Sequence, residues 1–288
     1  MKECLYYHRL DGNRLRCMLC PHGCTLAEGQ RGRCGSRRNL RGTLVSEVYA
    51  RPCAVAVDPV EKKPLAEFHP GTKCLSLACA GCNLRCLNCQ NHDISQARPD
   101  EVECYELMPE RAVDLALKHH IPGIAYTYTE PLTWYEYTYD TARLAHEKGL
   151  WNILVSAGFI NHDPLSELMP YIDAANIDLK AFSDDIYRKV CGARLQPVLD
   201  TLLNLHEAGV HLEITNLLIP GVNDGGELVR SMCRWLVENG LGDCPLHFSR
   251  FFPQYNMRNS RPTPRKTLFD ARDIAYSEGI RKVYLGNL

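Results

Sequence analysis

The pattern of hydrophobic and polar positions changes near residue 72 of this 288-residue chain. Beyond that point, short apolar runs alternate with amphipathic stretches whose apolar positions recur with a helical period. The apolar runs predict strands over residues 73–80, 123–128, 152–158, 174–180, 210–221, 245–252 and 282–286. The amphipathic stretches predict helices over residues 108–120, 131–149, 164–172, 196–209, 226–240 and 263–279.

This alternation predicts the fold class. Strands that alternate regularly with helices form a parallel sheet with helices packed on its faces. The chain offers six β–α units, two fewer than a closed eight-stranded barrel requires. We therefore expect an α/β protein in which residues 72–288 form an open, partial TIM-like barrel of six β–α units.

Residues 1–50 differ from the rest of the chain. They are polar and basic, rich in cysteine and glycine, and show little periodicity. So few core-forming positions predict a small, loop-rich module that a bound metal would hold together. Residues 51–71 are typical of a β-ribbon connector that closes at a His-Pro-Gly turn. The predicted division is residues 1–71 for the module with its connector and residues 72–288 for the barrel.

Composition limits the classes of function. The net charge is −1 and no long run of Lys or Arg is present, so nothing indicates nucleic acid or a charged membrane surface. No apolar stretch has the length of a signal-peptide core or a membrane span, so we expect a cytoplasmic protein. In that reducing compartment, the 15 cysteines are better explained as metal ligands or catalytic groups than as disulfides.

Cys79, Cys82, Cys86 and Cys89 are clustered directly after the first predicted barrel strand. A disulfide knot, a zinc knuckle and an iron–sulfur cluster would each use such a group. Loops after the strands form the active face of an α/β barrel, so the group falls where chemistry is expected. Three thiolates can ligate three irons of a 4Fe–4S cluster and leave the fourth iron open, as in a catalytic metal site. Cys79 could be a fourth ligand, but its position favours the end of the strand.

The segment CNLRCLNC, followed by QN, resembles the motif of the radical S-adenosylmethionine (SAM) superfamily. This resemblance implies that Cys82, Cys86 and Cys89 ligate a 4Fe–4S cluster whose open iron binds the amino and carboxylate groups of SAM. In that family an electron from the cluster cleaves SAM and releases a 5′-deoxyadenosyl radical. Asn88 departs from the family pattern, which usually has an aromatic residue at this place.

Segments further along the barrel also resemble the superfamily. TYTEP resembles the motif for the SAM amino group, and VSAG resembles the segment that contacts the ribose. NIDLK and LLIPGVND resemble segments of pyruvate formate-lyase activating enzymes. The resemblance implies SAM contacts from Thr129, Glu130, Ser156, Asp178, Lys180 and Asn216.

Each of these polar residues also has a plain structural explanation. Glu130 precedes a predicted helix, where the helix dipole favours an acid. Ser156 and Asn216 can satisfy backbone groups at strand ends, and Asp178 and Lys180 can pair with each other. The sequence leaves both explanations open.

A second group of cysteines lies in the N-terminal module, in the segments CMLCPHGC and GRCG. Four cysteines in a glycine-rich, core-poor segment favour a closed structural site, held by Cys17, Cys20, Cys24 and Cys34. Zinc, a second iron–sulfur cluster and unmetallated thiols remain open, and His22 could replace one ligand. These segments, RPCAVAVDPVEKKPL and the terminal VYLGN resemble the branch called AmmeMemoRadiSam.

The sequence therefore predicts a radical SAM enzyme that abstracts hydrogen from an unidentified substrate, a small molecule or a protein. Its cofactors would be a 4Fe–4S cluster and SAM, with zinc or a second cluster at the N-terminal site. An electron donor such as flavodoxin or ferredoxin would be its partner. One alternative is an activating enzyme for a glycyl-radical enzyme, and another is a non-catalytic, zinc-stabilised scaffold.

Overall fold

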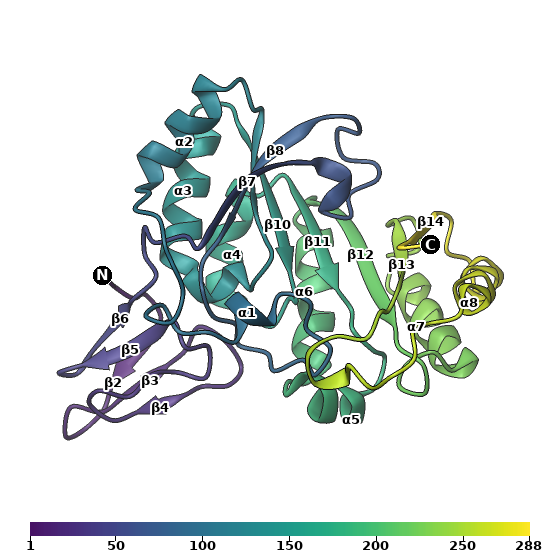
Figure 1. Cartoon of the computed structure of the whole chain (residues 1–288), viewed down its shortest axis with the longest axis horizontal. Coiled ribbons are helices and arrows are strands. Elements are labelled where there is room, and N and C mark those ends of the chain that lie inside the picture. Colours follow the sequence, from purple (N-terminus) through teal and green to yellow (C-terminus); the bar gives the residue numbers. More distant parts are fainter.

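The computed structural model describes residues 1–288 and is built around one eight-stranded sheet. The strand order is β14-β13-β12-β11-β10-β9-β8-β7, so neighbours in the chain are neighbours in the sheet (Figure 1). Seven strands are parallel: β8 (Lys73–Ala78), β9 (Gly123–Tyr126), β10 (Trp151–Ser156), β11 (Ala174–Asp178), β12 (His211–Leu218), β13 (Leu246–Arg250) and β14 (Val283–Gly286). β7 (Ala54–Pro59) pairs antiparallel with β8 at the edge.

Six longer helices connect successive parallel strands and cover the outside of the curved sheet (Figure 1). They are α2 (Pro109–Lys118), α3 (Tyr135–Glu147), α4 (His162–Leu168), α6 (Gln196–Glu207), α7 (Gly226–Glu238) and α8 (Arg265–Ser277). Shorter helical pieces are η1 (Val60–Lys62), α1 (His92–Ser95), η2 (Pro131–Trp134), η3 (Met169–Tyr171), α5 (Asp184–Ile186), the π-helical η4 (Tyr187–Cys191) and η5 (Tyr255–Met257). None of the helices has the length and apolar character that crossing a bilayer requires.

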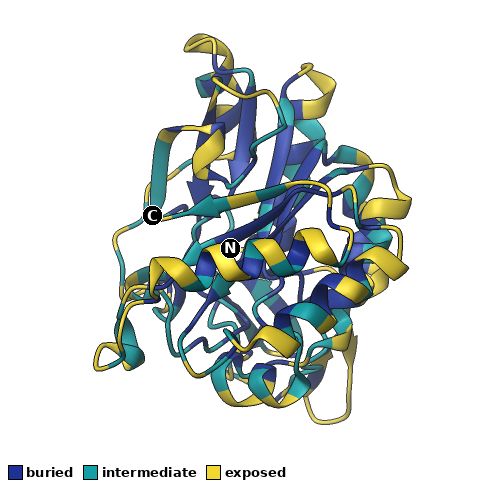
Figure 2. Ribbon diagram, turned by 90° about the vertical axis from the view of Figure 1, so that its right-hand side faces the viewer, coloured by how far each residue is buried: buried dark blue, intermediate teal, exposed yellow.

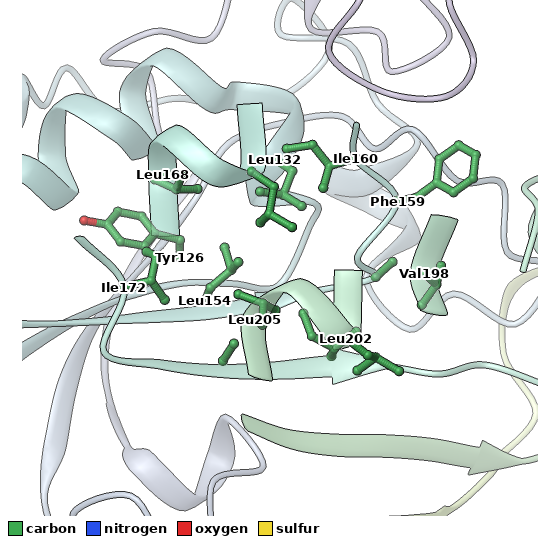
Figure 3. Packing of buried hydrophobic residues seen from close by; sticks show 14 of the residues in the cluster. Tyr126, Leu132, Leu154, Phe159, Ile160, Leu168, Ile172, Val198, Leu202 and Leu205 are labelled. Atoms are coloured by element: carbon green, nitrogen blue, oxygen red, sulfur yellow. The ribbon is translucent and has the colours of Figure 1, made fainter. Parts of the chain in front are cut away.

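The core lies between the sheet and these helices. Figure 2 shows the central strands buried inside and the helices exposed along their outer faces, while the edge strand β14 is largely intermediate in burial. Leu154 of β10 and Leu202 of α6 are fully buried in one apolar cluster, together with Tyr126 and Leu205 (Figure 3). The apolar stripe of each helix therefore holds it against the sheet.

The fold class predicted from the sequence is confirmed: six β–α units form a partial barrel, and β14 adds a seventh parallel strand. The predicted division at residue 71 differs from the strand pairing. β7 lies within the predicted connector, but it pairs with β8 along its whole length and so belongs to the large sheet.

Residues 1–50 contain two small antiparallel sheets connected by loops and turns. One joins β1 (Lys2–Glu3), β6 (Thr43–Ser46) and β5 (Arg37–Leu40); the other joins β2 (Tyr7–Arg9), β3 (Leu15–Cys17) and β4 (Thr25–Leu26). These strands are two to four residues long, too short to produce a visible alternation of apolar and polar positions.

The N-terminal module is attached to α3 by buried and half-buried charges. Arg37 forms an ion pair with Glu136, and both side chains are 1% exposed. The same carboxylate accepts a hydrogen bond of 2.8 Å from the backbone N–H of Leu5. Asp140, one turn further along α3, accepts a 2.6 Å hydrogen bond from the Tyr49 hydroxyl. The module therefore has a fixed position on the barrel.

Candidate active site

The predicted site residues converge at the carboxyl ends of the parallel strands. The cysteine-rich loop follows β8, and Glu130 lies shortly after β9. Ser156 is the last residue of β10, and Asp178 is the last residue of β11. Because parallel strands end at one edge of the sheet, four separate segments of the chain meet there.

The three predicted ligand cysteines lie on a short, tightly held loop. The Cys82 thiol accepts a 3.3 Å hydrogen bond from the backbone N–H of Leu84. The Cys89 thiol is 3.1 Å from the Ser95 hydroxyl oxygen in α1. The thiol of Cys86, itself buried, lies beside Cys191, and this neighbour and burial raise its pKa well above the usual value.

Cys79 is separate from these three thiols. It is fully buried, and its thiol donates to the carbonyl oxygen of Val48 in the N-terminal module at 3.5 Å. This contact agrees with the expectation that Cys79 belongs to the strand end.

Backbone hydrogen bonds hold the loop from two sides. The N–H of Cys82 donates to the carbonyl of Cys34 at 3.1 Å. On the other side, the N–H groups of Arg85 and Leu87 donate to the carbonyls at the end of η4, at 2.7 and 2.9 Å. The loop is therefore shaped by contacts that do not depend on its own thiols.

Glu130 is a buried carboxylate, 1% exposed, at the centre of the site. Its Oε1 accepts hydrogen bonds from the Ser156 hydroxyl at 2.7 Å and from the Leu132 N–H at 3.1 Å. Its Oε2 accepts from the Ala157 N–H at 2.8 Å. Burial raises the pKa of Glu130, whereas these hydrogen bonds lower it, and the net direction is upward. The helix-end contact foreseen from the sequence is present, but the carboxylate also links the ends of two strands.

Asp178 and Lys180 form the expected ion pair, with 2.9 Å between the lysine Nζ and a carboxylate oxygen. Although burial lowers the pKa of Lys180, the charges of Asp178 and of nearby Cys86 raise it well above its usual value. Lys180 is thus a cation beside the predicted cluster loop. Asn216 donates to the Leu179 carbonyl at 2.6 Å and fixes the backbone between the two charged residues.

Thr129 contacts the cysteine-rich loop directly. Its hydroxyl donates to the carbonyl of Cys79 at 2.7 Å, and the Asn91 side chain donates to the carbonyl of the preceding Tyr128 at 2.7 Å. Tyr128 has a positive φ of 64°, which produces the sharp turn between β9 and Glu130. The TYTEP segment and the cluster loop therefore hold each other in place.

The donor set fits an iron–sulfur cluster. Cys82, Cys86 and Cys89 bring three thiols into one loop after β8, one fewer than the four ligands of a closed structural zinc site. Burial raises the pKa of Cys82, and the neighbouring Glu130 raises it further; burial also raises the pKa of Cys89. Such thiols give up their protons when a metal binds. Three separated thiols in one loop suit a polynuclear cluster.

Sequence reasoning missed Cys191. This cysteine lies 102 positions after Cys89, at the end of the π-helical turn, and is 2% exposed. Its contact with Cys86 depends on the turn between Leu179 and α6, which has no cysteine motif. No pattern in the sequence pointed to it.

The N-terminal cysteines Cys17, Cys20, Cys24 and Cys34 are also brought together, and all four line one cavity. His22 lines the same cavity, but its Nε2 lies 2.8 Å from the Asn83 carbonyl oxygen. His22 therefore connects the module to the cluster loop. His247 of β13 lies near the opposite edge of the sheet, with its Nε2 2.5 Å from a carboxylate oxygen of Glu213.

Comparison with known families matches the part of the chain that carries this site. The family profile described as the Radical SAM superfamily matches residues 77–232. This range begins in β8 and ends in α7, so it includes the cysteine-rich loop and the ends of β9 to β12.

Two relatives differ in how much of the chain they cover. An uncharacterised protein of Methanocaldococcus jannaschii is 44% identical over 288 residues, which is 100% of this chain and 86% of the relative. The pyruvate formate-lyase-activating enzyme of Clostridium pasteurianum is 26% identical over 157 residues. That alignment covers 53% of this chain and 64% of the enzyme, so the chain spans less than two thirds of its length.

Solved structures support the fold. The Streptococcus suis protein SuiB bound to S-adenosylmethionine has a TM-score of 0.57 and 13% identity. The match covers 75% of this chain and 52% of the SuiB chain. At this identity the likeness concerns the fold alone.

Proposed function

This chain belongs to the radical SAM superfamily, and on that premise we propose that it binds a 4Fe–4S cluster through Cys82, Cys86 and Cys89 and SAM beside it. When bound, this pair supplies a 5′-deoxyadenosyl radical, formed by one-electron reductive cleavage of SAM. The radical would abstract hydrogen from a substrate not yet identified, a small molecule or a protein. A reduced flavodoxin or ferredoxin would be the electron donor.

One observation carries this proposal. Three loop thiols, the buried carboxylate of Glu130 and the partly buried ammonium group of Lys180 all lie at one edge of the sheet. Glu130 offers carboxylate oxygens that act as hydrogen-bond acceptors, suited to an amino group, and Lys180 offers a positive charge suited to a carboxylate. SAM carries both groups at one end. Because Glu130 and Ser156 are already hydrogen-bonded, both are oriented before any ligand arrives.

The N-terminal module also helps to position the cluster loop. It supplies the Cys34 carbonyl that holds Cys82, and the His22 ring that contacts Asn83 in the cluster loop. The loop is thus enclosed on the module side, which limits access of water to the reaction.

The test is anaerobic purification followed by reduction with dithionite in the presence of SAM. We expect about four irons per chain at this site and release of 5′-deoxyadenosine. Cys86→Ala should abolish the release, whereas Cys233→Ser, a buried cysteine of α7, should leave it unchanged. Release of 5′-deoxyadenosine by Cys86→Ala would contradict the ligand assignment, and an iron-free wild type would contradict the function.

A second candidate function is activation of a glycyl-radical enzyme, favoured by the alignment with the Clostridium pasteurianum enzyme. That alignment covers 53% of the chain. The N-terminal module lies outside residues 77–232, the range that the family profile matches. We therefore rank a different substrate first. A glycyl radical detected by electron paramagnetic resonance (EPR) on pyruvate formate-lyase incubated with this protein would reverse that order.

The zinc-stabilised scaffold is the least supported alternative. The family profile that matches residues 77–232 describes a superfamily of enzymes, which favours a catalytic protein over a scaffold. A colourless protein with stoichiometric zinc would restore this alternative.

A further inference from the structure

The four N-terminal cysteines surround a cavity that belongs to no part of the barrel site. Its lining includes Cys17, Cys20, Cys24 and Cys34, and its volume is about 20 Å³. Cys17 is the last residue of β3, and Cys24 directly precedes β4, which pairs with β3. The chain therefore builds the cavity from a hairpin, and Cys34 closes it from a separate turn.

Local backbone structure orients these thiols. The Cys17 N–H donates to the Cys24 carbonyl at 2.9 Å, and the Gly23 N–H donates to the Cys20 carbonyl at 3.1 Å. Gly23 has a φ of +54°, a conformation that lets the chain fold back between the second and third cysteine. This turn places three cysteines on one side of a hairpin, as in many metal-binding knuckles.

Four cysteines at one cavity are the full ligand set of a 4Fe–4S cluster. The cavity is larger than the ~10–15 Å³ that one water molecule requires, so space remains between the residues that line it. A zinc ion held by the same four cysteines is the competing occupant, and metal analysis distinguishes the two.

Hydrogen-bond donors surround the cavity. The Ser36 hydroxyl donates to the Cys34 thiol at 3.3 Å, and the Arg37 guanidinium contacts the Cys17 thiol at 3.8 Å. Arg37 also lines the cavity, and its buried Nε has no hydrogen-bond partner. A buried N–H without an acceptor is costly, and the sulfide or thiolate sulfur of a cluster would satisfy it.

We propose that Cys17, Cys20, Cys24 and Cys34 ligate a second 4Fe–4S cluster, which lies directly beside the cluster loop. Four cysteines are a full set of ligands, so this cluster has no open iron for SAM. This ligand assignment goes beyond the proposed function and does not depend on that function.

The position of the second cluster suggests its role. A single hydrogen bond of 3.1 Å joins the backbone of Cys34, a ligand of the second cluster, to the backbone of Cys82, a ligand of the first. This path suits one-electron transfer from a reduced ferredoxin or flavodoxin. The second cluster would gain one electron from that donor and lose it to the first, and no bond or proton would change. This part of the proposal rests on the proposed function.

The ligand assignment is tested in a variant that lacks the first cluster, Cys82→Ala with Cys86→Ala and Cys89→Ala. After anaerobic iron–sulfide reconstitution we expect about four irons per chain, no zinc, and the EPR signal of a reduced 4Fe–4S cluster. Adding Cys17→Ser and Cys20→Ser to this variant should remove that iron. One zinc per chain, or no metal at all, would overturn the proposal.

A second measurement covers the case in which that variant fails to fold. The wild type should then contain about eight irons per chain, and Cys17→Ser with Cys20→Ser should contain fewer. Cys104→Ser with Cys244→Ser, which lie outside both groups, should match the wild type. About four irons in the wild type would overturn the second cluster while leaving the proposed function intact.

The proximity of the two proposed clusters is tested by EPR of the dithionite-reduced protein. Two reduced clusters joined by so short a path should interact magnetically. The wild-type spectrum should therefore differ from the sum of the spectra of the two cluster-deficient variants. A wild-type spectrum equal to that sum would overturn the electron path.

Discussion

At the scale of single residues, Glu130 has the most demanding environment in the site. It is a buried acid whose two carboxylate oxygens accept three hydrogen bonds, from Leu132, Ser156 and Ala157. These donors fix the direction of its negative charge. The proposed role in binding the SAM amino group therefore depends on charge and on acceptor geometry together.

Glu130→Gln tests this role. The amide keeps the shape of the side chain but brings an N–H₂ group against backbone or hydroxyl donors, and it removes the charge. A hydrogen bond to a charged group contributes ~1.5–3 kcal/mol, so we expect SAM to bind about tenfold more weakly or worse, with the iron content unchanged. Anaerobic calorimetry measures this, with the exposed Glu207→Gln as the control. Equal affinity in both variants would contradict the role.

Cys191 is the residue that most directly challenges the open-iron account. Its thiol contacts Cys86, and a fourth thiolate ligand would close the iron that SAM must bind. We expect Cys191→Ser to retain the wild-type iron content and to release 5′-deoxyadenosine at a rate within about twofold of the wild type, since a serine can keep a hydrogen bond. Iron lost in Cys191→Ser at the level seen for Cys86→Ala would make Cys191 a ligand.

At the scale of elements, the cluster loop depends on close backbone approaches. Gly81 has a φ of +99°, and a Cβ added to it would collide with the carbonyl oxygen of Cys34. The neighbouring Cys82 donates to that same carbonyl. Only glycine allows the two backbones to lie this close.

We expect Gly81→Ala to displace Cys34 and to weaken iron binding at both cysteine groups. Alanine at positive φ costs about 1–2 kcal/mol, and the collision adds to this. Gly71→Ala separates the two effects, because Gly71 has a φ of +81° and nothing within 4 Å of its added Cβ. Iron content and thermal unfolding should be affected more at Gly81 than at Gly71. Equal effects would mean that the close approach is unimportant.

Strand β12 contains a separate buried carboxylate, Glu213, near its first residue and away from the cluster loop. Glu213 is fully buried and accepts hydrogen bonds from the N–H groups of Ala66 and Glu67, both at 2.9 Å. Although burial raises the pKa of Glu213, hydrogen bonds from His211, His247 and these N–H groups lower it to about 2. Its contribution to stability is therefore present above the unfolded-state pKa of 4.5 and is lost as the pH falls toward 2.

Glu213→Gln should accordingly destabilise the protein at pH 7 and reduce the loss of stability between pH 4.5 and 2. Urea unfolding at several pH values measures both effects, with the exposed Glu227→Gln as the matched control. If the free energy of unfolding of the variant fell as steeply with pH in this range as that of the wild type, other carboxylates would be responsible for the loss of stability in acid.

Elements and motifs differed in how well they could be predicted. The barrel strands and helices were predictable because each leaves a periodic pattern within its own sequence, as α7 and β12 do. The loop cysteines were predictable because their spacing is local. The Cys86–Cys191 and Cys34–Cys82 contacts join distant residues and follow from packing, which leaves no local pattern.

At the scale of the whole molecule, the account requires the N-terminal module to remain docked on the barrel. The buried ion pair of Arg37 and Glu136 is the central contact between them. Arg37 also lines the cysteine cavity, so the contact that docks the module also shapes the proposed second cluster site. The two sites are thus expected to be coupled through the module.

Glu136→Gln should leave Arg37 as a buried, unpaired charge. Breaking a buried ion pair from one side costs about 3–5 kcal/mol, whereas an exposed pair contributes about 0–1 kcal/mol. We expect a lower free energy of unfolding and a lower iron content than in Glu147→Gln, whose partner Arg143 is exposed. Thermal unfolding and iron analysis measure the difference, and indistinguishable variants would show that docking does not depend on this pair.

The central claim is that Cys82, Cys86 and Cys89 leave one iron of their cluster free for SAM. The most direct measurement is EPR of the reduced Cys17→Ser, Cys20→Ser protein before and after SAM is added, because this variant should retain only the barrel cluster. The account predicts a single 4Fe–4S signal whose shape changes when SAM binds. A signal that SAM leaves unaltered, or a sample that contains no cluster signal, would contradict it.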